Sequence, residues 1–360
     1  RLARAIDQMK SSGIDQIIIS DSTAIFYLLN QEIHSQERML ALYLNVNGNH
    51  TFVVSELFPI HDDLGMEIVY FSDSENPIDI LTKRVEGGKV LGIDKNWPAR
   101  FLLGLMEQRN DVEYKVASDM VDNLRMIKDE KEKELMRAAS KLNDESIEKL
   151  INLMNEKLTE ENLTEKELTD ILGQIYKEGG AEGFSFTPII AFGANAADPH
   201  AIARDVNVKP GDVIMIDIGC VKDHYCSDMT RTIFYKEVPE KSREVFETVL
   251  EAQKRAEALV KPGVRMCDID AACRDYITEK GYGPYFTHRT GHFIGLEDHD
   301  KGDVSSLNET VAQPGMIFSI EPGIYLQGDV GVRIEDLVLV TEDGCEVLNK
   351  YPKELVVIGK

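Results

Sequence analysis

The chain has 360 residues, which is enough for two domains at about 150 residues per domain. It carries 63 acidic and 40 basic side chains, and a net charge of −23 argues against a nucleic acid or an anionic membrane as partner. No run approaches the roughly 18 apolar residues of a membrane span, and no signal-peptide pattern opens the chain, so we expect a cytoplasmic protein. The five cysteines form no CxxC pair, which supports neither a disulfide framework nor a zinc knuckle.

The first part of the chain, residues 1–124, alternates short strand-like runs with short helices. Apolar runs such as IIIS and KVLGID predict strands, and residues 77–85 and 98–108 are expected to be helical. Asn47-Gly48 lies between the alternating runs ALYLNV and TFVVS, which is a strong hairpin signal. We therefore expect a small α/β domain without a catalytic cluster.

A second domain, residues 125–360, is predicted where a long charged amphipathic helix begins near Asp129. This part contains an internal repeat. The segments KPGDVIMIDIG (209–219) and QPGMIFSIEPG (313–323) each place an acid seven residues after the proline. Each follows an amphipathic helix that ends at glycine. The pattern predicts a duplicated helix-helix-hairpin unit with two hairpins around a pseudo-twofold axis.

The first hairpin is predicted between residues 213 and 235. Asp217 belongs to the alternating run VIMIDI, which has the period of a strand. If Lys222 and Asp223 form the turn, Asp217 and Asp228 stand directly across the ladder with Cβ atoms roughly 5 Å apart. Two like charges at that range on a half-buried face are unfavourable unless a proton or a cation lies between them. The hairpin therefore predicts a metal site.

The second hairpin repeats this arrangement. Ser319 and Glu321 alternate with apolar residues, and Glu321 and Glu335 lie symmetrically about Gly328. Two hairpins that each present a facing acid pair would bring four carboxylates to one place. Four carboxylates carry about four negative charges, which two divalent cations would neutralise.

Three histidines lie within twelve residues in THRTGHFIGLEDHD, at His288, His292 and His299. Imidazole ligands beside carboxylates favour a transition metal over magnesium. A two-metal centre of this kind can activate water and stabilise the attacking and leaving groups of a hydrolysis. Cleavage of a peptide bond next to a free amino terminus is the natural substrate chemistry, although the acids alone would also suit a phosphoesterase.

The motifs IDIG, YCSDMTRT, TGHFIGLEDHD, FSIEPGIY and VRIEDLVLVT resemble the proline-peptidase branch of the pita-bread metallopeptidases. This branch includes the Xaa-Pro dipeptidases, or prolidases, and the Xaa-Pro aminopeptidases. The resemblance covers residues 125–360 with five motifs in the family's order. It implies an α+β protein, in which a creatinase-type α/β N-terminal domain precedes a pseudo-twofold pita-bread catalytic domain.

The resemblance also implies five metal ligands. Asp217 would bind one ion, Asp228 and Glu335 would bridge two ions, and His292 and Glu321 would complete the other. Glu321 would in addition act as general base and then general acid. Two divalent ions are expected, with manganese favoured and cobalt, zinc or iron as alternatives.

Further residues match positions near the active site of such enzymes. His200, in the DPHAIA segment, matches a substrate-side catalytic histidine, and His299 matches a histidine that stabilises the tetrahedral intermediate. Arg333 matches an arginine that orients ligands or substrate. His288 and Tyr225 occupy positions near the site and are expected to contact substrate.

Several functional alternatives are weighed. Methionine aminopeptidases share the five ligands but usually lack the first domain and the Arg-x-Glu-Asp sequence found here. A metal-free pita-bread binding module is disfavoured because all five ligands are present. Within the proline branch, the short chain favours an Xaa-Pro dipeptidase over an Xaa-Pro aminopeptidase. A dipeptidase needs a cation for the proline carboxylate, and the segment after His299 offers only Lys301. The family resemblance further implies a homodimer.

Overall fold

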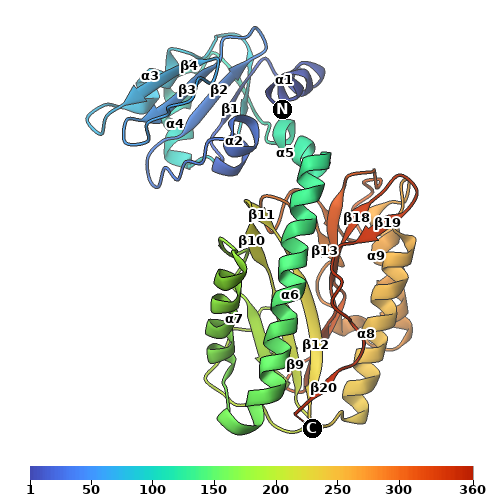
Figure 1. Cartoon of the computed structure of the whole chain (residues 1–360). Helices are drawn as coiled ribbons and strands as arrows, with labels where there is room; N and C mark the ends of the chain where they lie inside the picture. Colours follow the sequence, from blue (N-terminus) through green and yellow to red (C-terminus); the bar gives the residue numbers. More distant parts are fainter. Residues whose placement is uncertain (360) are drawn as a thin grey trace. The chain divides into compact units, whose positions relative to one another are not determined.

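The computed structural model describes residues 1–359, which form two compact units, residues 1–125 and the described residues from 126 onward. Each unit contains its own sheets and helices, as Figure 1 shows, and each is described by itself below. The α+β fold class expected from the sequence is confirmed. Among residues 1–359 no helix combines the length and apolar character needed to cross a bilayer.

The first unit is built on a six-stranded sheet with the order β4-β3-β2-β1-β5-β6. The strands are β1 (Gln16–Ile19), β2 (Ala41–Asn45), β3 (Thr51–Ser55), β4 (Glu67–Phe71), β5 (Val90–Ile93) and β6 (Glu113–Val116). The helices are α1 (Leu2–Ser11), α2 (Ser22–Leu29), α3 (Pro77–Thr82), α4 (Ala99–Gln108) and α5 (Asp119–Met126), the last of which ends just past the unit boundary. The predicted Asn47-Gly48 hairpin is confirmed, because β2 and β3 pair antiparallel and Gly48 has a φ of 91°.

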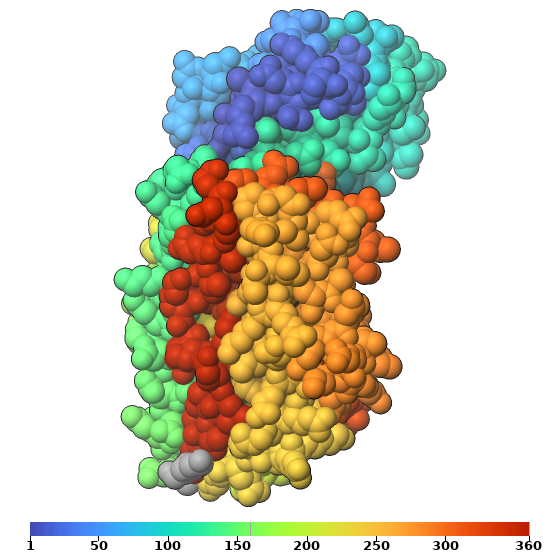
Figure 2. Space-filling model, turned by 90° about the vertical axis from the view of Figure 1, so that its right-hand side faces the viewer, coloured from blue at the N-terminus to red at the C-terminus, as the bar shows by residue number. Residues whose placement is uncertain are grey.

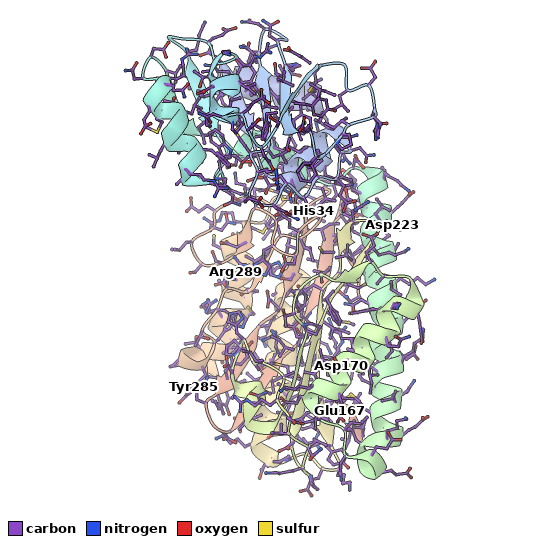
Figure 3. All side chains as sticks on the ribbon, turned by 90° about the vertical axis from the view of Figure 1, so that its left-hand side faces the viewer. His34, Glu167, Asp170, Asp223, Tyr285 and Arg289 are labelled. Atoms are coloured by element: carbon purple, nitrogen blue, oxygen red, sulfur yellow. The ribbon has the colours of Figure 1, made fainter. Side chains whose placement is uncertain are left out.

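Four long helices surround the sheets of the second unit. They are α6 (Glu130–Glu161), α7 (Glu165–Gly179), α8 (Glu240–Leu259) and α9 (Met266–Glu279). Asp129 begins α6 and Thr164 begins α7, each through a capping box that satisfies two free backbone N–H groups. The amphipathic pattern of α7 is visible in Figure 3, where Glu167 and Asp170 point outward, while Leu168 and Leu172 are buried against the sheet.

The strands of the second unit follow the helices in a repeated order. After α6 and α7 come β7 (Gly183–Phe184), β8 (Ile189–Phe192), η1 (Gly193–Ala197), β9 (Val213–Ile218), β10 (Cys220–Lys222), β11 (Tyr225–Cys226) and β12 (Met229–Tyr235). After α8 and α9 come η2 (Gly283–Tyr285), β13 (Gly291–His292), β14 (Asp303–Val304), β15 (Ile317–Ile320), β16 (Gly323–Leu326), β17 (Val330–Arg333), β18 (Asp336–Val340), β19 (Cys345–Val347) and β20 (Val357–Ile358). Two helices followed by hairpins occur twice, as the internal repeat predicts.

The C-terminal segment closes the second unit. Figure 2 shows it in red, as a strip between the green surface of α6 and the yellow and orange surface of α8 and α9. Its last strand, β20, pairs parallel with β12. The segment thus joins the two halves of the repeat along one face of the unit.

The register predicted for the first hairpin is wrong by two positions. The turn residues are Asp223 and His224, with φ values of 49° and 67°, in place of Lys222 and Asp223. Asp217 therefore lies opposite Thr230, and Asp228 follows β11 and precedes β12. Because the shift is even, both acids still share one face of the ladder, and they are diagonal instead of directly opposed.

The register predicted for the second hairpin is confirmed. Gly323 pairs with Arg333 in β16 and β17, and Ile320 pairs with Asp336 in β15 and β18. Glu321 and Glu335 lie between these two paired regions at equivalent positions. In the second hairpin, Glu321 and Glu335 therefore lie between two regions of regular strand pairing, and Asp228 lies in the same way between β11 and β12 of the first hairpin.

Candidate metal centre

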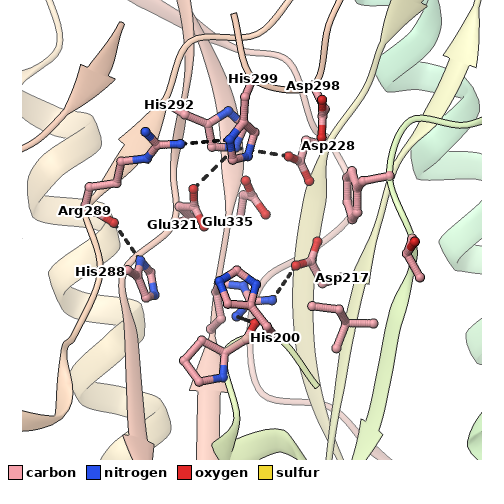
Figure 4. Close-up of a pocket in the computed structure, with 15 residues that line it drawn as sticks. His200, Asp217, Asp228, His288, Arg289, His292, Asp298, His299, Glu321 and Glu335 are labelled. Atoms are coloured by element: carbon pink, nitrogen blue, oxygen red, sulfur yellow. Dashed lines mark hydrogen bonds and ion pairs between the residues drawn. The ribbon is translucent and has the colours of Figure 1, made fainter. Parts of the chain in front are cut away.

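The predicted acids and histidines meet in one cavity of about 650 Å³. Figure 4 shows it from the side on which the histidine segment faces the two hairpins. The lining residues are Phe186, Thr187, Ile189, Pro199, His200, Asp217, Asp228, His288, Arg289, His292, Asp298, His299, Glu321, Arg333 and Glu335. The structure thus brings together all five expected metal ligands.

Three of these ligands form a tight group. Asp228, His292 and Glu335 each offer one ligand atom, and the three atoms lie within 4.8 Å of one another. His292 Nε2 lies 3.4 Å from an oxygen of Asp228 and 3.4 Å from an oxygen of Glu321. Carboxylate oxygens with one imidazole nitrogen are a ligand set that suits divalent transition metals.

Two oxygens of this group have no hydrogen-bond donor. Asp228 Oδ1 and Glu335 Oε1 are buried and lack a partner within the described residues. A buried carboxylate oxygen without a donor or cation is costly, since it loses its hydration without compensation. The two orphaned oxygens of Asp228 and Glu335 therefore fit divalent cations.

The electrostatics of Asp228 and Glu335 agree with this fit. Burial raises the pKa of Asp228 well above its ordinary value, and the charges of Asp217 and Glu321 raise it further. Burial likewise raises the pKa of Glu335 well above its ordinary value, and Asp228 and Glu321 add to the effect. Without a cation, both side chains are therefore strongly biased toward the protonated form.

Neighbouring groups oppose the effect of burial on the pKa values of Asp217 and Glu321. Burial raises the pKa of Asp217, although the attraction of Arg333 opposes this effect. Burial also raises the pKa of Glu321, but the neighbouring His292, His288 and Arg333 and the hydrogen bond from Ser319 outweigh it and leave the pKa below its ordinary value. Glu321 is thus the site carboxylate most strongly held in its ionised form.

Arg333 organises one wall of the cavity. It is buried and donates hydrogen bonds to Asp217 Oδ2, to Thr230 Oγ1 at 3.1 Å and to Tyr325 Oη at 2.7 Å. Thr230 Oγ1 in turn donates to Glu335 Oε2 at 2.7 Å. Arg333 and Thr230 thereby fix the orientation of two expected ligands that come from different hairpins.

The contacts of Arg333 extend to His288. The ring nitrogens of His288 lie 2.7 Å from the carbonyl oxygen of Arg289 and 2.8 Å from Tyr325 Oη. Because a carbonyl can only accept, Nδ1 carries the proton and Nε2 accepts from the tyrosine hydroxyl. Burial lowers the pKa of His288, in keeping with this neutral tautomer.

The ring of His299 stacks at a tilt on the ring of His292. The rings of His292 and His299 have centroids 3.9 Å apart and planes inclined by 31°. Arg289 Nη2 lies 2.9 Å from His299 Nδ1 and must donate, so the proton of a neutral His299 is on Nε2. Burial lowers the pKa of His299 to about 4, and the neighbouring His292 lowers it in the same direction.

His200 comes from a loop that Glu165 anchors. Glu165, in the first turn of α7, is fully buried and accepts backbone N–H groups from Phe192 at 2.7 Å and Arg204 at 2.6 Å. It also accepts the side-chain amide of Asn195 at 2.9 Å. His200 itself is exposed and lines the cavity, where Figure 4 places it close to Asp217.

Tyr225 lies elsewhere. Its ring packs with Met136, Ile294 and Leu337, and its hydroxyl donates to Glu132 at 2.9 Å. It is not among the residues that line the cavity, so the structure does not bring Tyr225 to the place where it was expected to contact substrate. The tyrosine beside the site is Tyr325, on β16.

Arg289, Asp298 and Tyr325 were missed by the sequence reasoning. The first two lie inside the histidine-rich segment, one residue from His288 and His299 respectively. Tyr325 is four residues after Glu321, on the second hairpin. Proximity to the motifs was the available signal. Alternation along a strand could not be applied to Arg289 and Asp298, which lie outside strands.

Characterised relatives cover the full length of the chain. An Xaa-Pro dipeptidase from Pyrococcus horikoshii is 35% identical over 359 residues, which is 99% of this chain and 98% of that protein. The crystal structure of a prolidase from Thermococcus sibiricus superposes with a TM-score of 0.92 at 32% identity and covers 99% of this chain and 98% of that one. The crystal structure of an X-Pro aminopeptidase from Thermotoga maritima gives a TM-score of 0.81 at 29% identity, covering 98% and 100%.

The two units match two protein families. Residues 1–127 match the creatinase/prolidase N-terminal domain, and residues 134–342 match metallopeptidase family M24. The second match begins within α6 and spans α7, α8 and α9, both hairpins and every residue that lines the cavity. The chain therefore belongs to metallopeptidase family M24 and carries the N-terminal domain of the creatinases and prolidases.

Proposed function

We propose that this metallopeptidase is an Xaa-Pro dipeptidase that hydrolyses the bond before a C-terminal proline. The observation that carries the proposal is the buried group of Asp228, His292 and Glu335, with two carboxylate oxygens that lack a donor. Xaa-Pro dipeptidases and prolidases are prominent among the relatives that cover the whole chain. The Thermotoga maritima structure keeps an Xaa-Pro aminopeptidase as the second candidate.

Two divalent ions would be held by the five expected ligands. Asp228 and Glu335 would bridge them, Asp217 would complete one ion, and His292 and Glu321 would complete the other. We favour manganese, because mixed carboxylate and imidazole ligands suit that part of the first transition row. When bound, the ions would supply an activated water and polarise the scissile carbonyl.

Glu321 would perform the proton transfers. Its carboxylate lies at the cavity surface, and Ser319 Oγ donates to Oε1 at 3.1 Å. The same serine hydroxyl accepts the backbone N–H of His292 at 3.0 Å, so one side chain positions the base relative to the ligand histidine. An ionised Glu321 would accept a proton from the attacking water and return it to the proline nitrogen as the peptide bond breaks.

Two histidines would bind the reacting peptide. The Nε2–H of a neutral His299 would donate to the oxygen that becomes negative in the tetrahedral intermediate. His200, on the loop that Glu165 holds, would contact the substrate from the Pro199 side of the cavity. Arg333 would act indirectly by orienting Asp217, and His288 would form part of the pocket wall.

Metal removal gives the first test. A chelator-treated chain is expected to lose hydrolysis of Ala-Pro, and added Mn²⁺ is expected to restore it, with two ions bound per chain by elemental analysis. Retained turnover in chain shown to be free of metal would contradict the proposed mechanism. The homodimeric state and the cytoplasmic location remain predictions.

A further inference from the structure

We propose that Arg289 binds the carboxylate of the substrate's C-terminal proline. The inference rests on the proposed function and adds a specificity-determining residue to it. A dipeptide differs from a longer peptide in carrying a full negative charge directly after proline. A cavity lined by five carboxylates repels such a group unless a cation is available beside them.

The cavity is lined by two guanidinium groups, and one is already committed. Arg333 is buried and donates to Asp217, Thr230, Tyr325 and the carbonyl of Pro199. Four of its five N–H groups are therefore occupied within the protein. Arg333 neutralises a carboxylate of the site and has little capacity left for a second one.

Arg289 is in the opposite situation. It is only partly buried, and its one side-chain hydrogen bond among residues 1–359 is the 2.9 Å contact from Nη2 to His299. No carboxylate among those residues forms an ion pair with it. Its remaining N–H groups leave a planar fork that matches the two oxygens of a carboxylate.

The position of Arg289 agrees with the length of a dipeptide. Its guanidinium lies beside His299, whose ring is stacked on the ligand His292 at 3.9 Å, as Figure 4 shows. Arg289 is therefore one imidazole ring away from the metal ligands. The proline carboxylate lies within one residue's length, about 3.3–3.6 Å of chain, from the scissile carbonyl.

Lys301 does not fill this role. It is the one cation in the segment that directly follows His299, but it does not line the cavity. We therefore assign the contact with the proline carboxylate to Arg289, and not to a residue of the segment that follows His299.

The test compares Ala-Pro with Ala-prolinamide, which has the same size without the charge. The manganese-loaded wild type is expected to favour Ala-Pro in kcat/KM by about 100-fold, the order expected for a hydrogen-bonded charge pair. Arg289→Met is expected to lose most of this preference, because Ala-Pro cleavage falls about 100-fold further than prolinamide cleavage. Arg289→Lys, which keeps the charge but not the fork, is expected to lie between them.

Lys301→Met is the matched control and is expected to keep the wild-type preference. Equal losses for both substrates in Arg289→Met would overturn the proposal, since they would mean that Arg289 acts only by orienting His299. A wild type that does not distinguish acid from amide would overturn it as well.

Inhibition by the product gives a second measurement, which uses only the wild-type protein and does not depend on whether a variant folds. Free proline is expected to inhibit the wild type at least about 10-fold more strongly than prolinamide, and equal inhibition would contradict a carboxylate contact. Failure of the proposed function has a different signature. In that case the wild type cleaves no Xaa-Pro substrate at all, whereas failure of the Arg289 contact alone leaves cleavage without a preference for the free acid.

Discussion

Replacing Glu335 by glutamine is expected to reduce turnover of an Xaa-Pro dipeptide by more than about 100-fold and to lower the number of metal ions bound. The amide keeps the shape of the side chain but cannot bridge two cations. A loss of 10- to 100-fold is typical for removing a group that only orients a ligand, so removal of a bridging ligand should exceed it. Kinetics and elemental analysis on the same sample measure both effects.

The same variant is expected to be more stable than wild type when both are free of metal. The pKa of Glu335 is raised in the folded chain, first by burial and then by Asp228 and Glu321. A raised carboxyl pKa destabilises the fold above the ordinary value of about 4.3, and the penalty grows as pH rises. The advantage of Glu335→Gln should therefore be largest near pH 8 and shrink as pH falls toward that value.

The control for Glu335→Gln is Glu342→Gln, an exposed acid just after β18. It should behave like wild type in turnover, metal content and stability. A metal-free Glu335→Gln chain that is less stable than wild type at pH 8 would contradict the electrostatic account of the site.

Replacing Arg333 by methionine is expected to destabilise the metal-free chain by about 3–5 kcal/mol, the cost of removing one partner of a buried ion pair. Asp217 would lose its cation, and Tyr325 and Thr230 would lose a donor. Urea unfolding followed by circular dichroism measures this, since the single tryptophan, Trp97, lies in the first unit and would not report on the site.

Arg137→Met serves as the comparison for Arg333. Arg137 pairs with Glu346 at 2.7 Å, but both side chains are about a third exposed or more, so the loss should stay below about 1 kcal/mol. Adding Asp217→Asn to Arg333→Met should recover part of the stability, because the unpaired charge is removed. Similar losses for Arg333→Met and Arg137→Met would show that the buried network contributes little.

The sequence was sufficient to place the acids on two hairpins, but not to align the first one. Gly328 marks the second turn, with a φ of 78°, and symmetry about it pairs Glu321 with Glu335 correctly. The first turn is formed by Asp223 and His224, both at positive φ. Neither residue is glycine, so no Asn-Gly or Asp-Gly signal indicated the position of the turn.

Contacts between separate elements could not be predicted from the sequence for a different reason. Periodicity identifies which side chains share a face of a strand, and it served for Asp217 and Arg333. It carries no information on Arg289 or Tyr225, whose environments depend on how separate elements pack. Tyr225 faces Glu132 on α6, and Arg289 reaches His299 through the fold of the histidine segment. Such contacts follow from tertiary structure alone.

We expect this chain to release proline from Xaa-Pro dipeptides. The most direct measurement is kcat/KM for Ala-Pro, Ala-Pro-Ala and Ala-Ala with the chain loaded with Mn²⁺. We predict that Ala-Pro is cleaved fastest and that Ala-Ala is cleaved poorly. A preference for Ala-Pro-Ala would identify an Xaa-Pro aminopeptidase, and a preference for Ala-Ala would contradict the assignment to proline substrates.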